Sequence, residues 1–192
     1  MVFVKRFIRL FCQVFGATKA LGTLNNLLRW AIGMDVLILL GSKSDLPIAD
    51  KCTKILQEFG VEHQVRVASA HRSPAFVEEI VQGALSDGVS VFIAMAGLAA
   101  ALPGAVAAMT TRPVIGVPCG GKVPFDSLLS IVQLPPGVPA ATVGVDRGDN
   151  AGYLAVQILA LSDERLSAAL VQNKLDQIAR VKQMDREING GE

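Results

Sequence analysis

Short apolar runs alternate along this chain with segments whose apolar residues recur every three or four positions. The run Val36–Leu40 is continuous and ends at Gly41, which is typical of a strand buried on both faces. Asp45 and Pro47 then supply a helix cap and a first-turn proline, and apolar residues at helical spacing continue to Phe59. The same reasoning predicts strands over residues 61–67, 89–95, 113–117 and 140–145, and helices over 74–88, 126–133, 150–161 and 163–188, with one more ending near 109.

Strands that alternate with helices through short loops predict a parallel sheet covered on both faces. Five strands indicate an α/β fold of the flavodoxin-like type, a three-layer sandwich with a five-stranded parallel sheet. Ligands bind such sheets outside the carboxyl ends of the strands. The loops that follow each strand are therefore where we look for chemistry.

Composition narrows the class of protein. Of the 192 residues, 51% are hydrophobic and only 18% are charged. A monomer of this size would expose much apolar surface with this composition, which favours a homo-oligomer. The net charge of +1 argues against a nucleic-acid partner, and no apolar run is long enough to span a membrane. The three scattered cysteines form no CxxC and no metal-ligand spacing, which fits a reducing, cytoplasmic location.

The first 33 residues differ from the rest, since they carry five basic residues and no acidic one. A transit peptide or a membrane-surface helix has this composition. Met34, however, directly precedes the first predicted strand and a complete domain follows it. We therefore interpret residues 1–33 as an N-terminal extension before a natural start at Met34.

Two of the loops carry polar groups suited to an anionic substrate. Gly41–Asp45 offers hydroxyls at a helix start, where N–H groups favour negative charge, and Asp45 could accept hydrogen bonds from ribose; ordinary helix capping is the alternative. In Ser69–Pro74, His71 is a candidate general acid–base and Arg72 a candidate phosphate clamp. His63 lies within a predicted strand, and we assign it no function.

The other loops carry less chemistry. Ala96–Gly104 is built of small residues, so a ligand could approach its backbone closely, although tight helix–sheet packing explains it equally well. Lys122 could contact an anion, whereas Cys119 has no base beside it. The polar run 146–150 is most simply a turn and a helix cap.

Taken together, these segments resemble the PurE family of purine biosynthesis. The resemblance rests on GSKSD at 41–45, SAHRSP at 69–74, AGLAAALPG at 96–104 and DSLLSIVQLPPGVP at 126–139, in the family's order. It implies a PurE-like catalytic domain over 34–165, followed by a C-terminal helix over 166–192. It also implies a flavodoxin-like sandwich assembled as a homo-octamer, without a metal or organic cofactor.

The resemblance implies conversion of N5-carboxyaminoimidazole ribonucleotide into 4-carboxy-5-aminoimidazole ribonucleotide by transfer of CO2. His71 corresponds to the family's catalytic histidine, which acts first as acid and then as base. The substrate-binding positions implied in the same way are Ser42, Ser44, Asp45, Ser69, Arg72, Ala96, Gly97 and Leu102.

One departure keeps a second activity open. Mutases of the family commonly carry a second histidine where this chain has Ala101, and the related carboxylases, which use free CO2, lack it too. Those carboxylases usually have lysine in place of Arg72, which favours the mutase. More remote alternatives are an electron-transfer flavodoxin or a non-catalytic nucleotide-binding module; Tyr153 is the only tyrosine available to stack on a flavin.

Overall fold

The structure of the protein is a computed structural model, which describes residues 34–190. The predicted extension over residues 1–33 lies outside the described residues. The described elements are β1 (Val36–Leu40), the 3₁₀ turn η1 (Lys43–Asp45), α3 (Leu46–Glu58), β2 (His63–Val67), α4 (Pro74–Ser86), β3 (Val91–Ala96), α5 (Leu102–Met109), β4 (Val114–Pro118), α6 (Pro124–Val132), β5 (Ala141–Thr142), α7 (Gly148–Ala160) and α8 (Glu164–Asn189).

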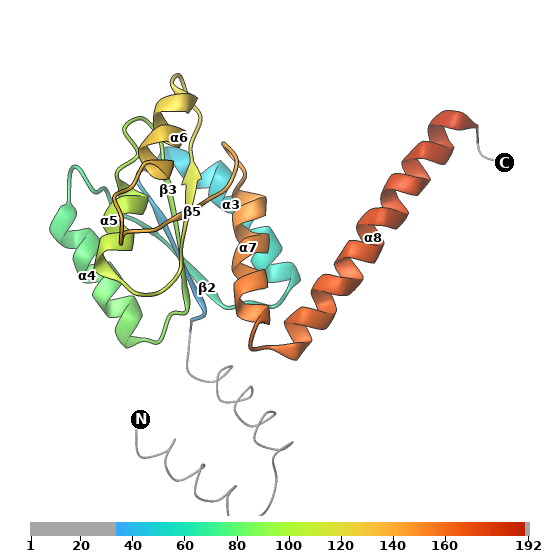
Figure 1. Ribbon diagram of the computed structural model, residues 1–192, viewed down its shortest axis with the longest axis horizontal. Coiled ribbons are helices and arrows are strands. Elements are labelled where there is room, and N and C mark those ends of the chain that lie inside the picture. The colour runs from blue at the N-terminus through green and yellow to red at the C-terminus, as the bar shows by residue number, and fades with distance from the viewer. Residues whose placement is uncertain (1–33, 191–192) are drawn as a thin grey trace, which may run out of the picture. The chain divides into compact units, whose positions relative to one another are not determined.

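The five strands form one parallel sheet in the order β2-β1-β3-β4-β5, which is the flavodoxin-like order. β1 pairs along its whole length with β2 on one side and with β3 on the other. Figure 1 shows helices on both faces of this sheet. The predicted three-layer architecture is confirmed.

The two faces of the sheet have separate apolar cores, because successive residues of a strand point to opposite sides. Val36, Ile38 and Leu40 face α3 and α7, together with the first turns of α8. Leu37 and Leu39 face α4 and α5. All five side chains of β1 are at most 1% exposed, which accounts for their continuous apolar run.

The two edge strands are shorter than predicted. β2 begins at His63 rather than at residue 61, because the Val61 N–H donates to the Leu56 carbonyl and so belongs to the end of α3. β5 covers only two residues, since the chain turns soon afterwards: the Arg147 N–H donates to the Gly144 carbonyl, and Asp146 has a φ of 57°. These turns redirect the chain into β2 and α7.

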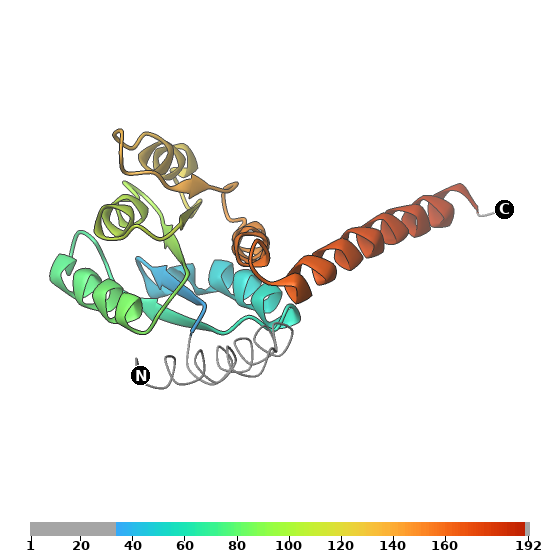
Figure 2. The ribbon, with the colours of Figure 1, turned by 60° about the horizontal axis from the view of Figure 1, so that its bottom comes forward.

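α8 packs on the sandwich only through its first turns. Asp163 caps it, accepting hydrogen bonds from the N–H groups of Arg165 and Leu166, and Leu166 is buried. From Val171 onward most side chains of α8 are exposed, and Figure 2 shows the helix running away from the other helices. Among the described helices, none combines the length and the apolar character needed to cross a membrane.

Two glycines of α7 let its backbone lie directly against the backbone of α3. A Cβ built on Gly148 would overlap the carbonyl oxygen of Ile48. One turn later, a Cβ on Gly152 would lie 3.0 Å from the carbonyl oxygen of Cys52. Both glycines therefore act by allowing close helix packing.

We expect Gly148→Ala to lower the free energy of unfolding by about 2 kcal/mol, because the added methyl group meets backbone that cannot move aside. Gly83→Ala is the matched control: Gly83 lies inside α4 with open space around it, so alanine should stabilise the protein by about 0.5–1 kcal/mol. Denaturant unfolding of both variants measures the difference. Equal stabilities would contradict the role given to the α3–α7 contact.

Candidate functional site

The candidate site is built at the carboxyl edge of the sheet, where the parallel strands end together. Backbone hydrogen bonds extend the strand pairing into the loops there. The Gly41 N–H donates to the Met95 carbonyl at 2.9 Å, and the Cys119 N–H donates to the Ala96 carbonyl at 2.9 Å. The sheet itself thus brings together the loops after β1, β2, β3, β4 and β5.

The loop after β1 is closed by its own hydrogen bonds. Ser42 Oγ accepts from the Ser44 N–H, and the Asp45 carboxylate accepts from the Ser42 N–H at 3.0 Å and from the Ser44 hydroxyl at 3.3 Å. Ser42 is therefore the N-cap of η1 and Asp45 completes its capping box, whereas Asp45 makes no side-chain cap to α3, although it precedes that helix. Because these N–H groups are used within the loop, the hydroxyl proton of Ser42 remains as a donor for an anion.

Arg72 joins the loop after β2 to the loop after β1. Its guanidinium donates to the Gly41 carbonyl through Nη2 at 3.0 Å and to Ser69 Oγ through Nε at 3.3 Å. Ser69 Oγ also accepts from the Arg72 N–H, while the Ser73 hydroxyl donates to the Ser69 carbonyl. These contacts place a fixed positive charge beside the turn that carries Ser42.

His71 lies in the turn between Ser69 and Ser73, next to Arg72. Its side chain is exposed in the single chain. His63, by contrast, is half-buried in β2, and its Nδ1 lies 2.8 Å from the Val61 carbonyl oxygen. The two histidines of the chain therefore occupy different environments, and His71 is the one at the carboxyl edge of the sheet.

An acidic cluster lies at the same edge of the sheet and was not predicted from the sequence. It consists of Asp45, Cys119 and Asp146. The Cys119 thiol, which donates to the Val117 carbonyl at 3.8 Å, also lies beside the Asp45 carboxylate, and both aspartates act on Cys119 through their charge. Asp146 in turn accepts a 2.8 Å hydrogen bond from the Gly120 N–H and is tied to α3 by Lys51, whose ammonium donates to its carbonyl. The sequence holds one indication of this contact. Asp146 follows the fifth predicted strand, and the carboxyl ends of parallel strands meet at one edge of the sheet.

Burial governs the protonation of this cluster. It raises the pKa of the Asp45 carboxyl above its ordinary value of 3.8. The Ser42 N–H, the Ser44 hydroxyl and the Cys119 thiol act in the opposite direction and lower this pKa, whereas the charge of Asp146 adds a smaller upward contribution. Burial and the two neighbouring carboxylates raise the pKa of the Cys119 thiol to about 12. Cys119 is thus a neutral hydrogen-bond donor at physiological pH and no nucleophile, in agreement with its interpretation as inert.

The loop after β3 presents backbone to the same edge. Gly97 lies against the loop after β4, since a Cβ there would sit 3.3 Å from the Cys119 carbonyl oxygen. Leu98 is 69% exposed and has a φ of 55°, a conformation that costs a leucine energy. Ala96 and Leu102 are buried in the core, so any contact they make with a ligand would come through their backbone.

Within residues 34–190, no three His, Cys, Asp or Glu side chains are grouped so that they could hold a metal ion. The polar groups at the carboxyl edge are instead suited to an anionic organic ligand. Arg72 and the serine hydroxyls supply donors for a phosphate, and Asp45 supplies an acceptor for hydroxyl groups.

Comparison with known proteins adds independent findings. Residues 35–180 match the family model described as AIR carboxylase. The N5-carboxyaminoimidazole ribonucleotide mutase of Methanocaldococcus jannaschii is 54% identical over 154 residues, which cover 80% of this chain and 96% of that protein. The chloroplastic phosphoribosylaminoimidazole carboxylase of Vigna aconitifolia is 45% identical over 72% of this chain and 25% of its own length.

A solved structure agrees with the same assignment. The crystal structure of Treponema denticola PurE resembles this one with a TM-score of 0.70 and 28% sequence identity, over 79% of this chain and 96% of that one. Sequence, fold and the loops at the carboxyl edge therefore lead to one conclusion: this chain belongs to the AIR carboxylase family.

Proposed function

We propose that this protein is a purine-biosynthesis enzyme that converts N5-carboxyaminoimidazole ribonucleotide into 4-carboxy-5-aminoimidazole ribonucleotide. The observation that carries the proposal is the 54% identity to a mutase of that name across 96% of its length. The bridge from Arg72 to the Gly41 loop supports it, because it places a phosphate-binding charge beside the ribose-binding groups.

The residues divide the work as follows. Arg72, Ser42, Ser44 and Ser69 bind the phosphate, and Asp45 accepts hydrogen bonds from the ribose hydroxyls. The backbone at Ala96, Gly97 and Leu102 lies along the base. His71 is left as the titratable group that moves protons.

The chemistry needs one proton carrier. His71 as imidazolium donates a proton to the carbamate nitrogen, whereupon the nitrogen–carbon bond breaks and its electron pair stays on nitrogen, releasing CO2 and a neutral amine. Ring carbon C4 then attacks CO2 as an enamine carbon. The C4 proton passes to the now neutral His71, which restores both the aromatic ring and the imidazolium.

CO2 must be retained between these steps, so the site must exclude water. His71 is exposed in the single chain, and covering it requires a further surface. This supports an oligomer in which neighbouring subunits close the site, and we propose the homo-octamer of the family. A cytoplasmic location fits both this substrate and the free thiols of Cys52 and Cys119.

Direct carboxylation is the second candidate. It would add free CO2 to aminoimidazole ribonucleotide and so omit the first protonation. Ala101 leaves it open, because that position offers no polar side chain to bind a carboxylate, and the phosphoribosylaminoimidazole carboxylase of Vigna aconitifolia is among the similar proteins. Arg72 favours the mutase.

We expect the purified protein to form product from the carbamate substrate at least about tenfold faster than from aminoimidazole ribonucleotide with bicarbonate at equal concentrations. Product absorbance followed in parallel reactions measures both rates. Faster turnover of the second mixture would instead assign the carboxylase activity.

We expect His71→Asn to lower kcat by about 10²–10⁴-fold, because asparagine cannot carry the proton between nitrogen and C4. Nucleotide affinity should change little, since phosphate binding rests on Arg72 and the serines. His63→Asn is the control and should retain kcat within about twofold. Full turnover by His71→Asn would overturn the catalytic assignment.

We expect Asp45→Asn to bind the ribonucleotide about tenfold more weakly, through loss of an ionised acceptor, while becoming more stable than the wild type. Because its folded-state pKa is raised, wild-type Asp45 contributes stability that is present at low pH and lost as the pH rises through that pKa. The stability difference should therefore grow from about pH 4 to pH 7.

Thermal unfolding across that range, together with titration of the ribonucleotide, measures both effects. Asp50→Asn is the matched control, since Asp50 is an exposed carboxylate on α3, and it should change neither quantity. Unchanged affinity in Asp45→Asn would remove Asp45 from the site.

A further inference from the structure

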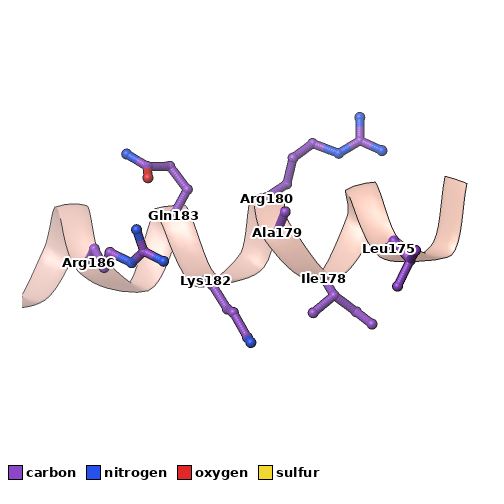
Figure 3. Close-up of a pocket in the computed structure, with 7 residues that line it drawn as sticks. All are labelled: Leu175, Ile178, Ala179, Arg180, Lys182, Gln183 and Arg186. Atoms are coloured by element: carbon purple, nitrogen blue, oxygen red, sulfur yellow. The ribbon is translucent and has the colours of Figure 1, made fainter. Parts of the chain in front are cut away.

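A pocket on the surface of the described chain is lined by residues of α8 alone. Figure 3 shows Ile178 and Lys182 on one side of this helix, whereas Arg180 and Gln183 point to the other. Because a small ligand needs walls from several elements to bury most of its surface, a single helix does not build a site for it. A polar group that the proposed mechanism leaves unused lies elsewhere: it is the Asp146 carboxylate at the carboxyl edge of the sheet.

Asp146 has a backbone conformation that glycine adopts more easily. Its φ is 57°, in the left-handed region, and Leu98 is the only other described residue besides glycines with a positive φ. The surrounding chain holds Asp146 in this conformation. Its N–H donates to the Pro118 carbonyl at 2.9 Å, and its carbonyl accepts from Lys51 Nζ at 3.3 Å. A conformation that costs energy and is held in this way is typical of residues near a functional site.

The side chain of Asp146 reaches the loop after β4. Its Oδ1 accepts a 2.8 Å hydrogen bond from the Gly120 N–H. The two residues lie so close that a Cβ built on Gly120 would be 2.7 Å from Asp146 Oδ2. The carboxylate therefore meets the backbone of this loop directly, which the missing side chain of Gly120 allows.

The peptide between Cys119 and Gly120 is held from more than one side. The Cys119 carbonyl accepts a hydrogen bond at 3.0 Å from the hydroxyl of Ser127, which is buried in α6. A Cβ built on Gly97 would lie 3.3 Å from the same carbonyl oxygen, so the loop after β3 packs against this peptide. Asp146 supplies the contact from the loop after β5.

We propose that Asp146 is a positioning residue, whose carboxylate holds the Cys119–Gly120 peptide and, through it, the Gly97 backbone along the base of the substrate. This role rests on the proposed function, in which the base carries both the nitrogen that loses CO2 and the carbon that takes it up. A small displacement of this backbone misplaces both atoms relative to CO2 and slows the reaction. The proposed phosphate contacts come from Arg72 and the serines in other loops, so substrate binding depends on Asp146 less than turnover does.

The hydrogen bond of Asp146, rather than its charge, serves this role. Burial raises the pKa of the Asp45 carboxyl, and the negative charge of Asp146 raises it further, which opposes ionisation of the proposed ribose acceptor. An asparagine at position 146 would remove that charge and still accept from the Gly120 N–H. Asparagine also tolerates the left-handed backbone.

Two substitutions separate the hydrogen bond from the charge and from the backbone conformation. Asp146→Asn keeps the acceptor and should retain kcat within about threefold. Asp146→Gly keeps the backbone conformation but loses the acceptor, so kcat should fall by about 10- to 100-fold while KM stays within about threefold. Asp149→Asn is the charge control, since Asp149 pairs with Arg147 at 2.9 Å, and it should change neither constant.

Each other result of these kinetics overturns the proposal. Wild-type kcat in Asp146→Gly would mean that only the turn matters. An equal loss of kcat in Asp146→Asn would mean that the charge is required. A raised KM in both variants with kcat unchanged would make Asp146 a direct contact of the substrate.

Hydrogen exchange of the loop after β4 tests the same contact without turnover. In Asp146→Gly, the Gly120 amide should exchange at least about tenfold faster than in the wild type, followed by mass spectrometry of a peptide that spans residues 118–126. In Asp146→Asn its exchange should match the wild type. Unchanged protection in Asp146→Gly would overturn the proposal. A wild type that turns over no substrate would refute the proposed function alone and would leave this exchange measurement readable.

Discussion

The pairing of β1 with two neighbours at once is the constraint on which the site depends. β1 is buried on both faces and forms hydrogen bonds along both edges, so it cannot shift its register without exposing its whole apolar set. Its end fixes the position of Gly41, and the Met95 and Ala68 backbones bond directly to that end. Main-chain pairing therefore positions the loops, and the side-chain hydrogen bonds of Ser42, Asp45 and Arg72 then hold the polar groups within them.

The five-stranded parallel sheet and the edge that carries the site could be predicted from sequence, because both follow from the alternation of apolar runs with helical patterns. A continuous apolar run such as Val36–Leu40 is typical of a strand in a sheet that is covered on both faces. Parallel strands place the loops that follow them at one edge of that sheet. The edge strands were predicted less well. Val61 is a residue type typical of strands, and the sequence pattern placed it in β2. Its N–H instead donates to the Leu56 carbonyl at the end of α3, a hydrogen bond that the residue type does not reveal.

The acidic cluster shows a different limit. Asp45, Cys119 and Asp146 are far apart along the chain, and each has an ordinary local explanation as a cap, a buried thiol or a turn residue. Their contact depends on Asp146 adopting a left-handed backbone and reaching back to Gly120, which only the folded chain reveals. The catalytic use of His71 and the substrate contacts stay predictions, since they rest on the residue types in these loops and on family resemblance.

The glycine contact between α3 and α7 has a consequence for ligand binding. Gly148 lies against Ile48, so the amino-terminal ends of the two helices touch, and these are the ends that carry Asp146 and Asp45. Lys51 adds a second tie between them. A ribonucleotide bound between these loops would contact segments whose positions are already fixed. Binding would therefore cost little conformational entropy and require no large closing motion.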